Sequence, residues 1–572
     1  MKHKHLIALC LVLAVSVCSC STYSKKENES EISISDDAYK EQYEKACTTP
    51  FGKYPELVTY SLGKMTGANN SNMPEGDTYE NNAYTRYLKG FLNIQNDNAF
   101  EVSDDDGYDD VLDMAIANNN LPDIMVVSDL KTLEKLVKLD MIEDLTDIYK
   151  NCASDKIKEI YNSYGDVIFN NVTFSDKLMA LPETNIEDGP NLLWLRKDWM
   201  DKLGVEEPKT LEEALKIVKS FVECDPGENG EGNTVGLVCD ANLTGDRGYS
   251  SEYQMDIVFA NNNSYPKQWI YNSKGEVVYG SVQKEAKATL KKLHQMYEDN
   301  ILDNQFLLRT TTNIIELIDQ GECGSFFGPW WTPNNPLMQA MQKDPEADWQ
   351  PYVISTDGTG TLSYHSQNPS YKYVAVRKGY EHPEIAAKII STLFDYVRYE
   401  DKDANELVAY YQQNVDPSAR PIAINIDYSD ALSRCYENLT NALDGTKAPS
   451  ELELLEYSYY QSCQSYLAAT KKKEKVTAED WAAYMSRINA CSLINKANTK
   501  KVDSLFFGTT ETMQSEWWQL EKMEKKAYLE IVTGVKPIEY FDEFVKEWNE
   551  KGGLTITKEV SKIVKKRVVS HP

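Results

Sequence analysis

Residues 108–128, YDDVLDMAIANNNLPDIMVVS, place a helix, a turn and a buried strand in direct succession. The apolar residues of the first half recur at helical spacing and stop at a cluster of asparagines, which predicts a helix over 108–118. The second half is a compact apolar run, which predicts a buried strand over 121–127. A helix that leads into a buried strand is a unit from which α/β sheets are built.

The segments on either side repeat this alternation. A strand is predicted over 56–62, a helix over 77–94 and a short strand over 100–102. A helix over 131–139 follows, with its leucines and valine on one face. The order β-α-β-α-β with short elements predicts a parallel sheet that is covered by helices.

A second α/β stretch begins further along the chain. It has a predicted strand over 191–195, a helix over 210–222, and later strands over 324–327 and 371–376. From about residue 383 the apolar spacing is helical and stays so to the C-terminus. The predicted fold class is therefore α/β with a helical C-terminal region.

The charge of the chain excludes several classes of function. Its 572 residues include 60 Lys and Arg against 89 Asp and Glu, a net charge of −29. Such a field repels phosphate, which argues against nucleic-acid binding and against adsorption to anionic lipid. HExxH, GxSxG, P-loop and GxGxxG motifs are missing from the sequence, so no catalytic residue and no required cofactor is predicted.

The N-terminus has the form of a bacterial export signal. Residues 1–20, MKHKHLIALCLVLAVSVCSC, join a basic start to an apolar run that is too short to span a bilayer. The small residue before Cys20 resembles a lipobox, in which the cysteine is lipidated and becomes the new N-terminus. Cys18 is a rival acceptor, and plain secretion is the alternative. The polar residues 21–50 are expected to form a flexible linker.

Eight cysteines lie outside the signal. None forms a CxxC pair or a spacing typical of metal ligands. An exported chain permits disulfides, but the scattered spacing favours buried free thiols that pack as small hydrophobes. These residues are Cys47, Cys152, Cys224, Cys239, Cys323, Cys435, Cys463 and Cys491.

Four segments besides 108–128 have distinctive sequences: LPETNIEDGPNLLWLRKDWMDKLG at 181–204, WIYNSKGEVVYG opening 269–303, GECGSFFGPWW within 317–337, and YLEIVTGVKPIEYFDEF opening 528–553. In this order, they resemble the extracellular solute-binding proteins of carbohydrate ABC transporters, family 1. The likeness is to the lipoprotein branch of low-GC Gram-positive bacteria, and it covers the chain from about residue 55 to 560.

The resemblance implies two α/β lobes of the type II periplasmic-binding-protein-like fold, joined by crossovers near 181–185 and 370–376. The implied protein is a non-enzymatic monomer. It captures a carbohydrate between the lobes and delivers it to membrane permeases, while a lipid anchor holds it at the outer face of the cytoplasmic membrane. The expected divisions are lobe one over 51–184 and 371–430, lobe two over 185–370, and a helical region over 431–572 that contributes to both lobes.

The sharpest binding motif is Gly328-Pro329-Trp330-Trp331. A flat indole can stack on the C–H face of a sugar ring, and the resemblance implies that Trp330 faces the cleft. Either tryptophan also suits a core. The other candidates for ligand contact, each with a structural alternative, are Tyr60 and Ser61 at a strand end, Glu183 and Asn185 after the first crossover, Trp269, Arg309 as a hydroxyl or uronate binder, and Tyr371.

Residues 225–234, DPGENGEGNT, resemble the family's shortened EF-hand loop. Ca²⁺ prefers several oxygen ligands from alternate loop positions. The side chains of Asp225, Asn229 and Asn233 and the carbonyl of Glu231 keep that register. Two positions where the family has Asp lack a carboxylate here, which lowers the expected affinity. The alternative is a glycine-rich loop without metal.

Other functions remain open at this level. One rival is a protein of the same fold that binds a non-sugar ligand or an acidic oligosaccharide. A second is an exported glycoside hydrolase, because 89 acidic residues offer many carboxylate pairs. A third is a lipoprotein that presents sugar to a membrane sensor.

Overall fold

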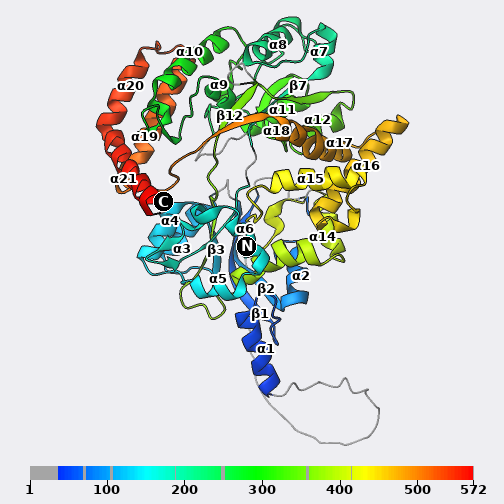
Figure 1. Cartoon of the computed structure of the whole chain (residues 1–572), viewed down its shortest axis with the longest axis vertical. Helices are drawn as coiled ribbons and strands as arrows, with labels where there is room; N and C mark the ends of the chain where they lie inside the picture. The colour runs from blue at the N-terminus through cyan, green and yellow to red at the C-terminus, as the bar shows by residue number, and fades with distance from the viewer. Residues whose placement is uncertain are drawn as a thin grey trace, which may run out of the picture.

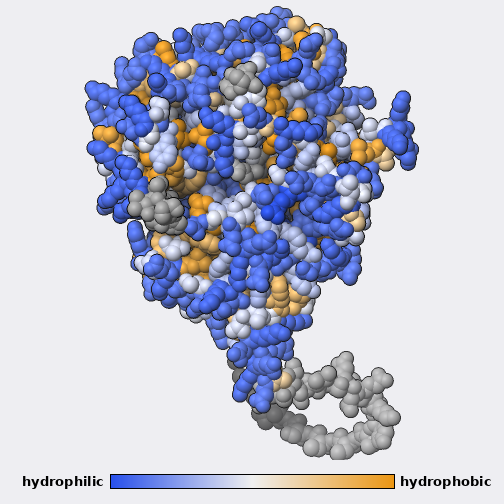
Figure 2. Space-filling view, viewed as in Figure 1, coloured by the Kyte–Doolittle hydropathy of each residue, from blue (hydrophilic) through white to orange (hydrophobic). Residues whose placement is uncertain are grey.

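The computed structural model describes residues 36–67, 72–103, 107–186, 189–245, 252–355, 360–413 and 415–570. The elements form two lobes, one above the other in Figure 1, and helix α1 projects from the lower lobe. The face in Figure 2 is mostly hydrophilic, with hydrophobic residues in scattered groups. Among the described residues, no helix has both the length and the apolar character needed to cross a bilayer.

The first lobe is built on a sheet of strand order β2-β1-β3-β13-β6. β1 pairs in parallel with β2 and β3, which confirms the predicted parallel arrangement, whereas β13 runs antiparallel to β3 and β6. The chain thus returns to this sheet after building the second lobe. The strands are β1 Val58–Thr66, β2 Ile94–Ser103, β3 Ile124–Val127, β6 Leu181–Pro182 and β13 Tyr373–Val376.

Helices cover this sheet, and their ends follow from capping residues. The predicted helix over 77–94 begins only at Ala83, because Asn82 adopts an extended backbone and accepts hydrogen bonds from the first turn. Asp129 caps the helix that follows β3 in the same way. The helices are α2 Ala83–Leu92, α3 Tyr108–Ala117, α4 Leu130–Lys138, α5 Thr146–Cys152, α6 Asp155–Asn162, α13 Ile385–Ser391, the π-helix Thr392–Glu400, and α14 Asn405–Gln412.

The second lobe has a three-stranded antiparallel sheet of order β10-β7-β11, with β7 Leu192–Arg196, β10 Ser325–Gly328 and β11 Trp349–Tyr352. All five residues of β7 are buried. The surrounding helices are α7 Lys197–Leu203, α8 Leu211–Cys224, α9 Asp256–Asn261, α10 Lys284–Glu298, α11 Thr311–Asp319 and α12 Leu337–Lys343. Two-stranded sheets join β4 Thr173–Phe174 to β5 Lys177–Leu178, β8 Trp269–Tyr271 to β9 Val277–Tyr279, and β12 Thr361–His365 to β14 Asn498–Val502.

The helical C-terminal region packs mainly against the second lobe. Tyr528 and Trp548 share a hydrophobic core with Leu193 of β7, and Trp481 shares one with Trp194 of the same strand. Leu454 instead joins the core of the first lobe, so the region contacts both lobes. Its helices are α15 Ala431–Asp444, α16 Leu454–Lys472, α17 Ala478–Tyr484, the π-helix Met485–Ala490, α18 Cys491–Lys496, α19 Glu511–Val532, α20 Tyr540–Trp548 and α21 Leu554–Ser570.

Three segments cross between the lobes side by side. Backbone hydrogen bonds join Glu183 N to Lys372 O at 2.7 Å and Thr184 N to Asn425 O at 2.9 Å. These bonds tie the first crossing segment, which follows β6, to the second, which precedes β13, and to the third, which precedes α15. Three adjacent crossing segments form a small connection between two large cores, as is typical of a hinge.

The N-terminal part differs from the sequence expectation in one respect. The signal over 1–20, with Cys18 and Cys20, and the linker up to residue 35 lie outside the described residues. The second half of the predicted linker, however, is helix α1, Asp36–Thr48. Polar residues dominate the helix, but Ala46 is buried against the first lobe, and burial of that contact accounts for the order.

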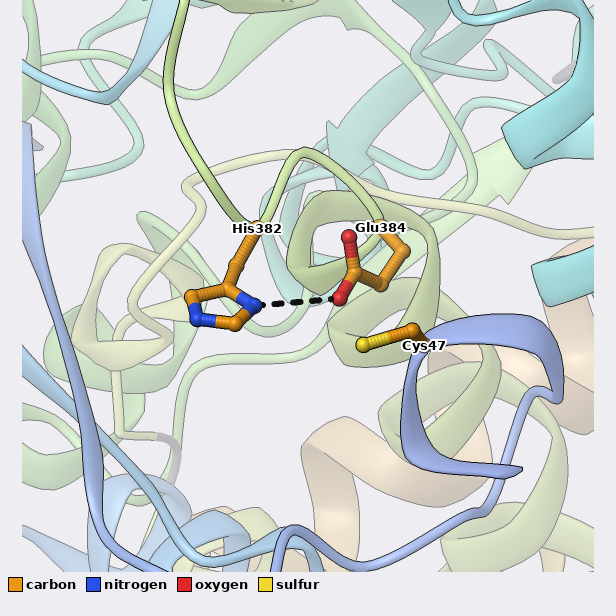
Figure 3. A group of neighbouring side chains, drawn as sticks. All are labelled: Cys47, His382 and Glu384. Carbon is orange, nitrogen blue, oxygen red and sulfur yellow. Dashed lines mark hydrogen bonds and ion pairs between the residues drawn. The ribbon is translucent and has the colours of Figure 1, made fainter. Parts of the chain in front are cut away.

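A cluster of polar side chains fastens α1 to the first lobe. Cys47, His382 and Glu384 place a thiol, an imidazole and a carboxylate within 4.8 Å of one another (Figure 3). Glu384 Oε1 already accepts a hydrogen bond from the Tyr54 hydroxyl at 2.5 Å and lies 3.3 Å from His382 Nδ1. Burial and the nearby carboxylate raise the pKa of Cys47 to about 12, so the thiol keeps its proton. These contacts hold helix α1 against the first lobe, which is a structural role.

Candidate functional site

A cavity of about 1210 Å³ lies between the two lobes. Its wall combines the carboxyl end of β1, the crossing segments, the turn after β10 and parts of the helical C-terminal region. The volume exceeds the roughly 300–1,000 Å³ of common small-molecule sites, so the cavity has room for a ligand with several rings.

Strand β1 delivers different residues to this cavity than the sequence pattern predicts. The strand continues to Thr66, four residues beyond the expected end, and Thr66 and Gly67 line the cavity. Tyr60 and Ser61 consequently lie in mid-strand. Tyr60 is 1% exposed in the core of the first lobe, and Ser61 Oγ donates to Asp123 Oδ2 at 2.7 Å. Neither residue lines the cavity.

Two neighbouring tryptophans reach the cavity wall through the turn after β10. A Cβ on Gly328 would lie 2.6 Å from Thr332 Oγ1, so this turn requires glycine. Trp330 is 4% exposed, and the guanidinium carbon of Arg487 lies 4.3 Å from the centroid of its ring. Trp331 is only half-buried. Both line the cavity, but one face of Trp330 is already covered, which leaves Trp331 the more accessible ring.

Arg487 is the most unusual group on the wall. Its guanidinium carbon lies 4.3 Å from the Trp330 ring centroid and 4.1 Å from that of Tyr459. Nη2 donates to the Tyr459 hydroxyl at 2.8 Å. Nε is buried and has no hydrogen-bond acceptor among the described residues. Stacking on aromatic rings is favourable for a guanidinium, but it does not neutralise the charge.

Two acidic side chains with buried carboxyl groups, Glu453 and Glu456, also line the cavity. Burial raises the pKa of Glu453 to about 8, even though Arg398 acts in the other direction. Burial also raises the pKa of Glu456, whose Oε1 accepts from Asn438 Nδ2 at 2.8 Å. Near neutral pH, Glu453 is therefore largely protonated and contributes little negative charge to the cavity.

The crossing segments bring three of the predicted residues to the cavity. Glu183, Asn185 and Tyr371 all line it. Two of these side chains also hold the hinge: Glu183 Oε1 accepts from Asn425 N at 3.1 Å, and Asn185 Nδ2 donates to Asn368 O at 2.9 Å. These two side chains therefore line the cavity and stabilise the hinge at the same time.

The structure does not bring Trp269 and Arg309 to the cavity. Trp269 is 3% exposed within the core of the second lobe, where its ring lies 5.0 Å from that of Tyr279. Arg309 Nε forms an ion pair with Asp303 Oδ2 at 2.6 Å. Aromatic and guanidinium groups serve packing and ion pairing as readily as ligand contact, and a single sequence does not separate these uses.

The loop over 225–234 closes on itself. Asp225 accepts hydrogen bonds from Asn229 N at 3.0 Å and from Thr234 Oγ1 at 2.5 Å. Asn229 donates through Nδ2 to Gly321 O at 2.9 Å, and Asn233 Nδ2 donates to Asn229 O at 2.9 Å. The side-chain amides of Asn229 and Asn233 therefore donate hydrogen bonds to Gly321 and to the loop itself.

These residues do not fit a Ca²⁺ shell. Asp225 is the one side-chain carboxylate in the predicted ligand set, because Glu231 was expected to use its backbone carbonyl. At the third loop position, a Cβ on Gly227 would lie 2.6 Å from Trp199 Cζ2, so the packing leaves no space for an acidic ligand there. Ca²⁺ takes about 6–8 oxygen ligands, several of them charged.

Sequence reasoning missed Arg487, Tyr459, Glu453 and Arg398. They lie in helical segments without a motif, and their spacing along the chain is that of any amphipathic helix. Only the packing of three separate helical segments makes them part of the cavity: the π-helix Thr392–Glu400, α16, and the π-helix Met485–Ala490. No signal in a single sequence distinguishes them from surface or core residues.

Curated proteins of known function show recognisable similarity. The chain is 23% identical over 365 residues to the polygalacturonan/rhamnogalacturonan-binding protein YtcQ of Bacillus subtilis, covering 58% of this chain and 69% of that protein. It is 21% identical over 468 residues to lipoprotein LipO of the same organism, covering 80% of this chain and 84% of that protein.

Solved structures show the same fold at lower identity. The fructooligosaccharide transporter component FusA of Streptococcus pneumoniae, solved with kestose, matches with a TM-score of 0.61 and 15% identity over 90% of this chain and 100% of that chain. A variant of FusA is described as an EF-hand mutant. The alginate-binding protein AlgQ2 matches with a TM-score of 0.60 and 13% identity over 89% of this chain and 98% of that chain.

The match to a family extends over more than half of the chain. Residues 70–395 match the bacterial extracellular solute-binding proteins. The two-lobed α/β fold, the crossing segments and the cavity between the lobes are consistent with that match. The chain therefore belongs to the family of bacterial extracellular solute-binding proteins.

Proposed function

We propose that this protein captures an oligosaccharide between its lobes and delivers it, as a monomer, to the permease subunits of an ABC importer. The observation that carries this proposal is the cavity of about 1210 Å³ beside a three-segment hinge, with Trp331 and Tyr371 on its wall. Aromatic rings among polar groups suit a sugar, which has apolar C–H faces and a rim of hydroxyls. YtcQ, FusA and AlgQ2 are all named for, or solved with, saccharides.

Glu453 and Glu456 are not placed as a catalytic pair for glycoside hydrolysis. Glycoside hydrolysis uses two carboxyl groups that flank the scissile bond. The two buried carboxyl groups of the cavity, Glu453 and Glu456, lie within one turn at the start of α16, where Glu453 N donates to Glu456 Oε2 at 3.3 Å. Two groups on the same helical turn support one wall and do not face each other across a ligand.

A thermal-shift screen against a glycan library tests the proposed function. Ligand that binds only the folded protein raises its apparent stability, by about 2.7 kcal/mol at 100 times the dissociation constant. The best ligand should then reduce the radius of gyration in X-ray scattering, because the lobes close about the crossing segments. If no glycan stabilises the protein while amino acids or peptides do, the carbohydrate assignment fails.

We further propose that Cys20 carries the lipid anchor and that α1 begins the folded body. Cys20→Ser should move the protein from the membrane fraction to the medium, because the diacylglycerol can no longer be attached. Cys18→Ser is the matched control and should stay in the membrane fraction. Immunoblots of fractionated cells measure both variants. The reverse pattern would make Cys18 the acceptor, and retention of both single variants would contradict this anchor site.

The loop at Asp225 is expected to fold without calcium. The melting temperature in calorimetry should be the same in EGTA and in millimolar CaCl₂, because the loop supplies too few carboxylates. Asp225→Ala should lower it equally in both buffers, since its three hydrogen-bond donors lose their acceptor. Stabilisation by calcium in the parent protein but not in this variant would restore the metal site.

A further inference from the structure

The cavity contains a cationic group without an anionic partner. Arg487 forms no ion pair with any carboxylate in the described part of the chain. Its partners are two aromatic rings and one phenolic hydroxyl, and its Nε has no acceptor. A partly buried guanidinium in this state retains its full charge and its demand for an acceptor.

Two other arginines of the cavity wall form ion pairs. Arg398 pairs with Asp427 at 2.9 Å, and Arg434 pairs with Asp430 at 2.7 Å. Lys156, which also lines the cavity, is paired as well: its Nζ lies 2.9 Å from Glu159 Oε2. Arg420 also lines the cavity without an ion pair, but it donates to Ile424 O at 3.1 Å. Among the described arginines of the cavity, a buried N–H group without an acceptor is found only on Arg487.

Glu453 on the cavity wall does not neutralise the charge of Arg487. Tyr459, which contacts Arg487, lies on α16, and Glu453 lies at the start of the same helix. Because burial raises the pKa of Glu453 to about 8, that group is mainly neutral at pH 7.

The aromatic neighbours also define how the guanidinium can bind. Trp330 and Tyr459 lie against its carbon at 4.3 and 4.1 Å. A planar guanidinium held by rings keeps a fixed orientation and presents its N–H groups at its edge, which matches the two oxygens of a carboxylate. Trp330 is thus a positioning residue for Arg487.

We propose that the cavity selects oligosaccharides containing uronic acids, and that Arg487 binds a uronate carboxylate. This inference rests on the proposed function and narrows it to a substrate class. From the sequence, Arg309 is a candidate for binding hydroxyls or a uronate, with a salt bridge as the alternative. The structure pairs it with Asp303 and places it outside the cavity. The guanidinium that meets the chemical requirement is Arg487.

Matched ligands test the selection. Oligogalacturonides and oligomannuronates are titrated calorimetrically into the full mature protein, each beside its carboxyl-reduced, uncharged form. At least one acidic ligand should bind roughly tenfold to hundredfold more tightly than its reduced form, which is the range of one charge-assisted pair. Arg487→Gln should remove most of that ratio, and Arg487→Lys should restore it only in part. Arg309→Gln, outside the cavity, should leave the ratio unchanged.

The outcomes separate this inference from the proposed function. Equal binding of acidic and reduced forms by the parent protein would overturn uronate selection while the sugar-binding function survives. Tighter binding of an unrelated neutral glycan than of any acidic ligand would likewise overturn uronate selection and leave the sugar-binding function intact. Binding of no glycan at all would defeat the proposed function itself. If Arg487→Gln does not fold, the comparison of paired ligands on the parent protein still decides.

Discussion

Trp331→Ala is expected to weaken binding of the cognate oligosaccharide by roughly tenfold to hundredfold while the melting temperature changes little. The ring is half-buried and lines the cavity, so its removal sacrifices ligand contact more than core packing. Stacking of one indole on a sugar is worth about 1–3 kcal/mol, judged from the area that aromatic side chains bury. Each 1.4 kcal/mol corresponds to about tenfold in the dissociation constant.

Trp330→Ala is the matched comparison and should lower the melting temperature strongly as well as the affinity. Trp330 is 4% exposed and belongs to a hydrophobic core with Trp194 and Phe326. Truncation of a buried tryptophan costs about 3–5 kcal/mol of stability. It should also loosen Arg487 and thereby reduce binding. Calorimetric titration and thermal melting of both variants measure the two effects. A Trp330→Ala protein with unchanged melting and lost affinity would make Trp330 the stacking platform.

Lys64→Met is expected to lower the stability of the first lobe by about 3–5 kcal/mol, because each buried carbonyl that loses its donor costs about 1–3 kcal/mol. Lys64 lies on β1 and is fully buried. Its Nζ donates to the carbonyls of Ser418, Arg420 and Pro421, the last two at 2.7 and 3.5 Å. Methionine fills a similar volume but leaves these carbonyls without a donor.

The carbonyls that Lys64 holds belong to a loop of the cavity wall, so affinity should fall together with stability. The melting temperature should decrease by roughly 6–20 °C, at about 2–4 °C per kcal/mol for a domain of 150–250 residues. Lys378→Met, on an exposed lysine of the same lobe, is the control and should melt like the parent. A Lys64→Met protein with the stability and affinity of the parent would show that this ammonium group does not support the loop.

The elements that depend on local pattern were predictable from the sequence. The helix and buried strand of 108–128 appear as α3 and β3, because the periodicity and the asparagine stop act over a few residues. The parallel pairing of β1 with β3 follows from the β-α-β order. Errors arose at the boundaries. β1 extends to Thr66, and that extension moves Tyr60 and Ser61 from the cavity edge into the strand.

The chain by itself determined the α/β class and the position of the two tryptophans beyond β10, since both follow from short-range patterns. The crossover between lobes was expected only from the resemblance to the family. Only the tertiary structure decided which ring stays open to a ligand. Arg487 covers Trp330 from a distant helical segment, and Glu453 loses its charge through burial. The chemistry of the cavity depends on contacts and solvent exclusion between remote segments. Those are properties of packing, and no local spacing of residues encodes them.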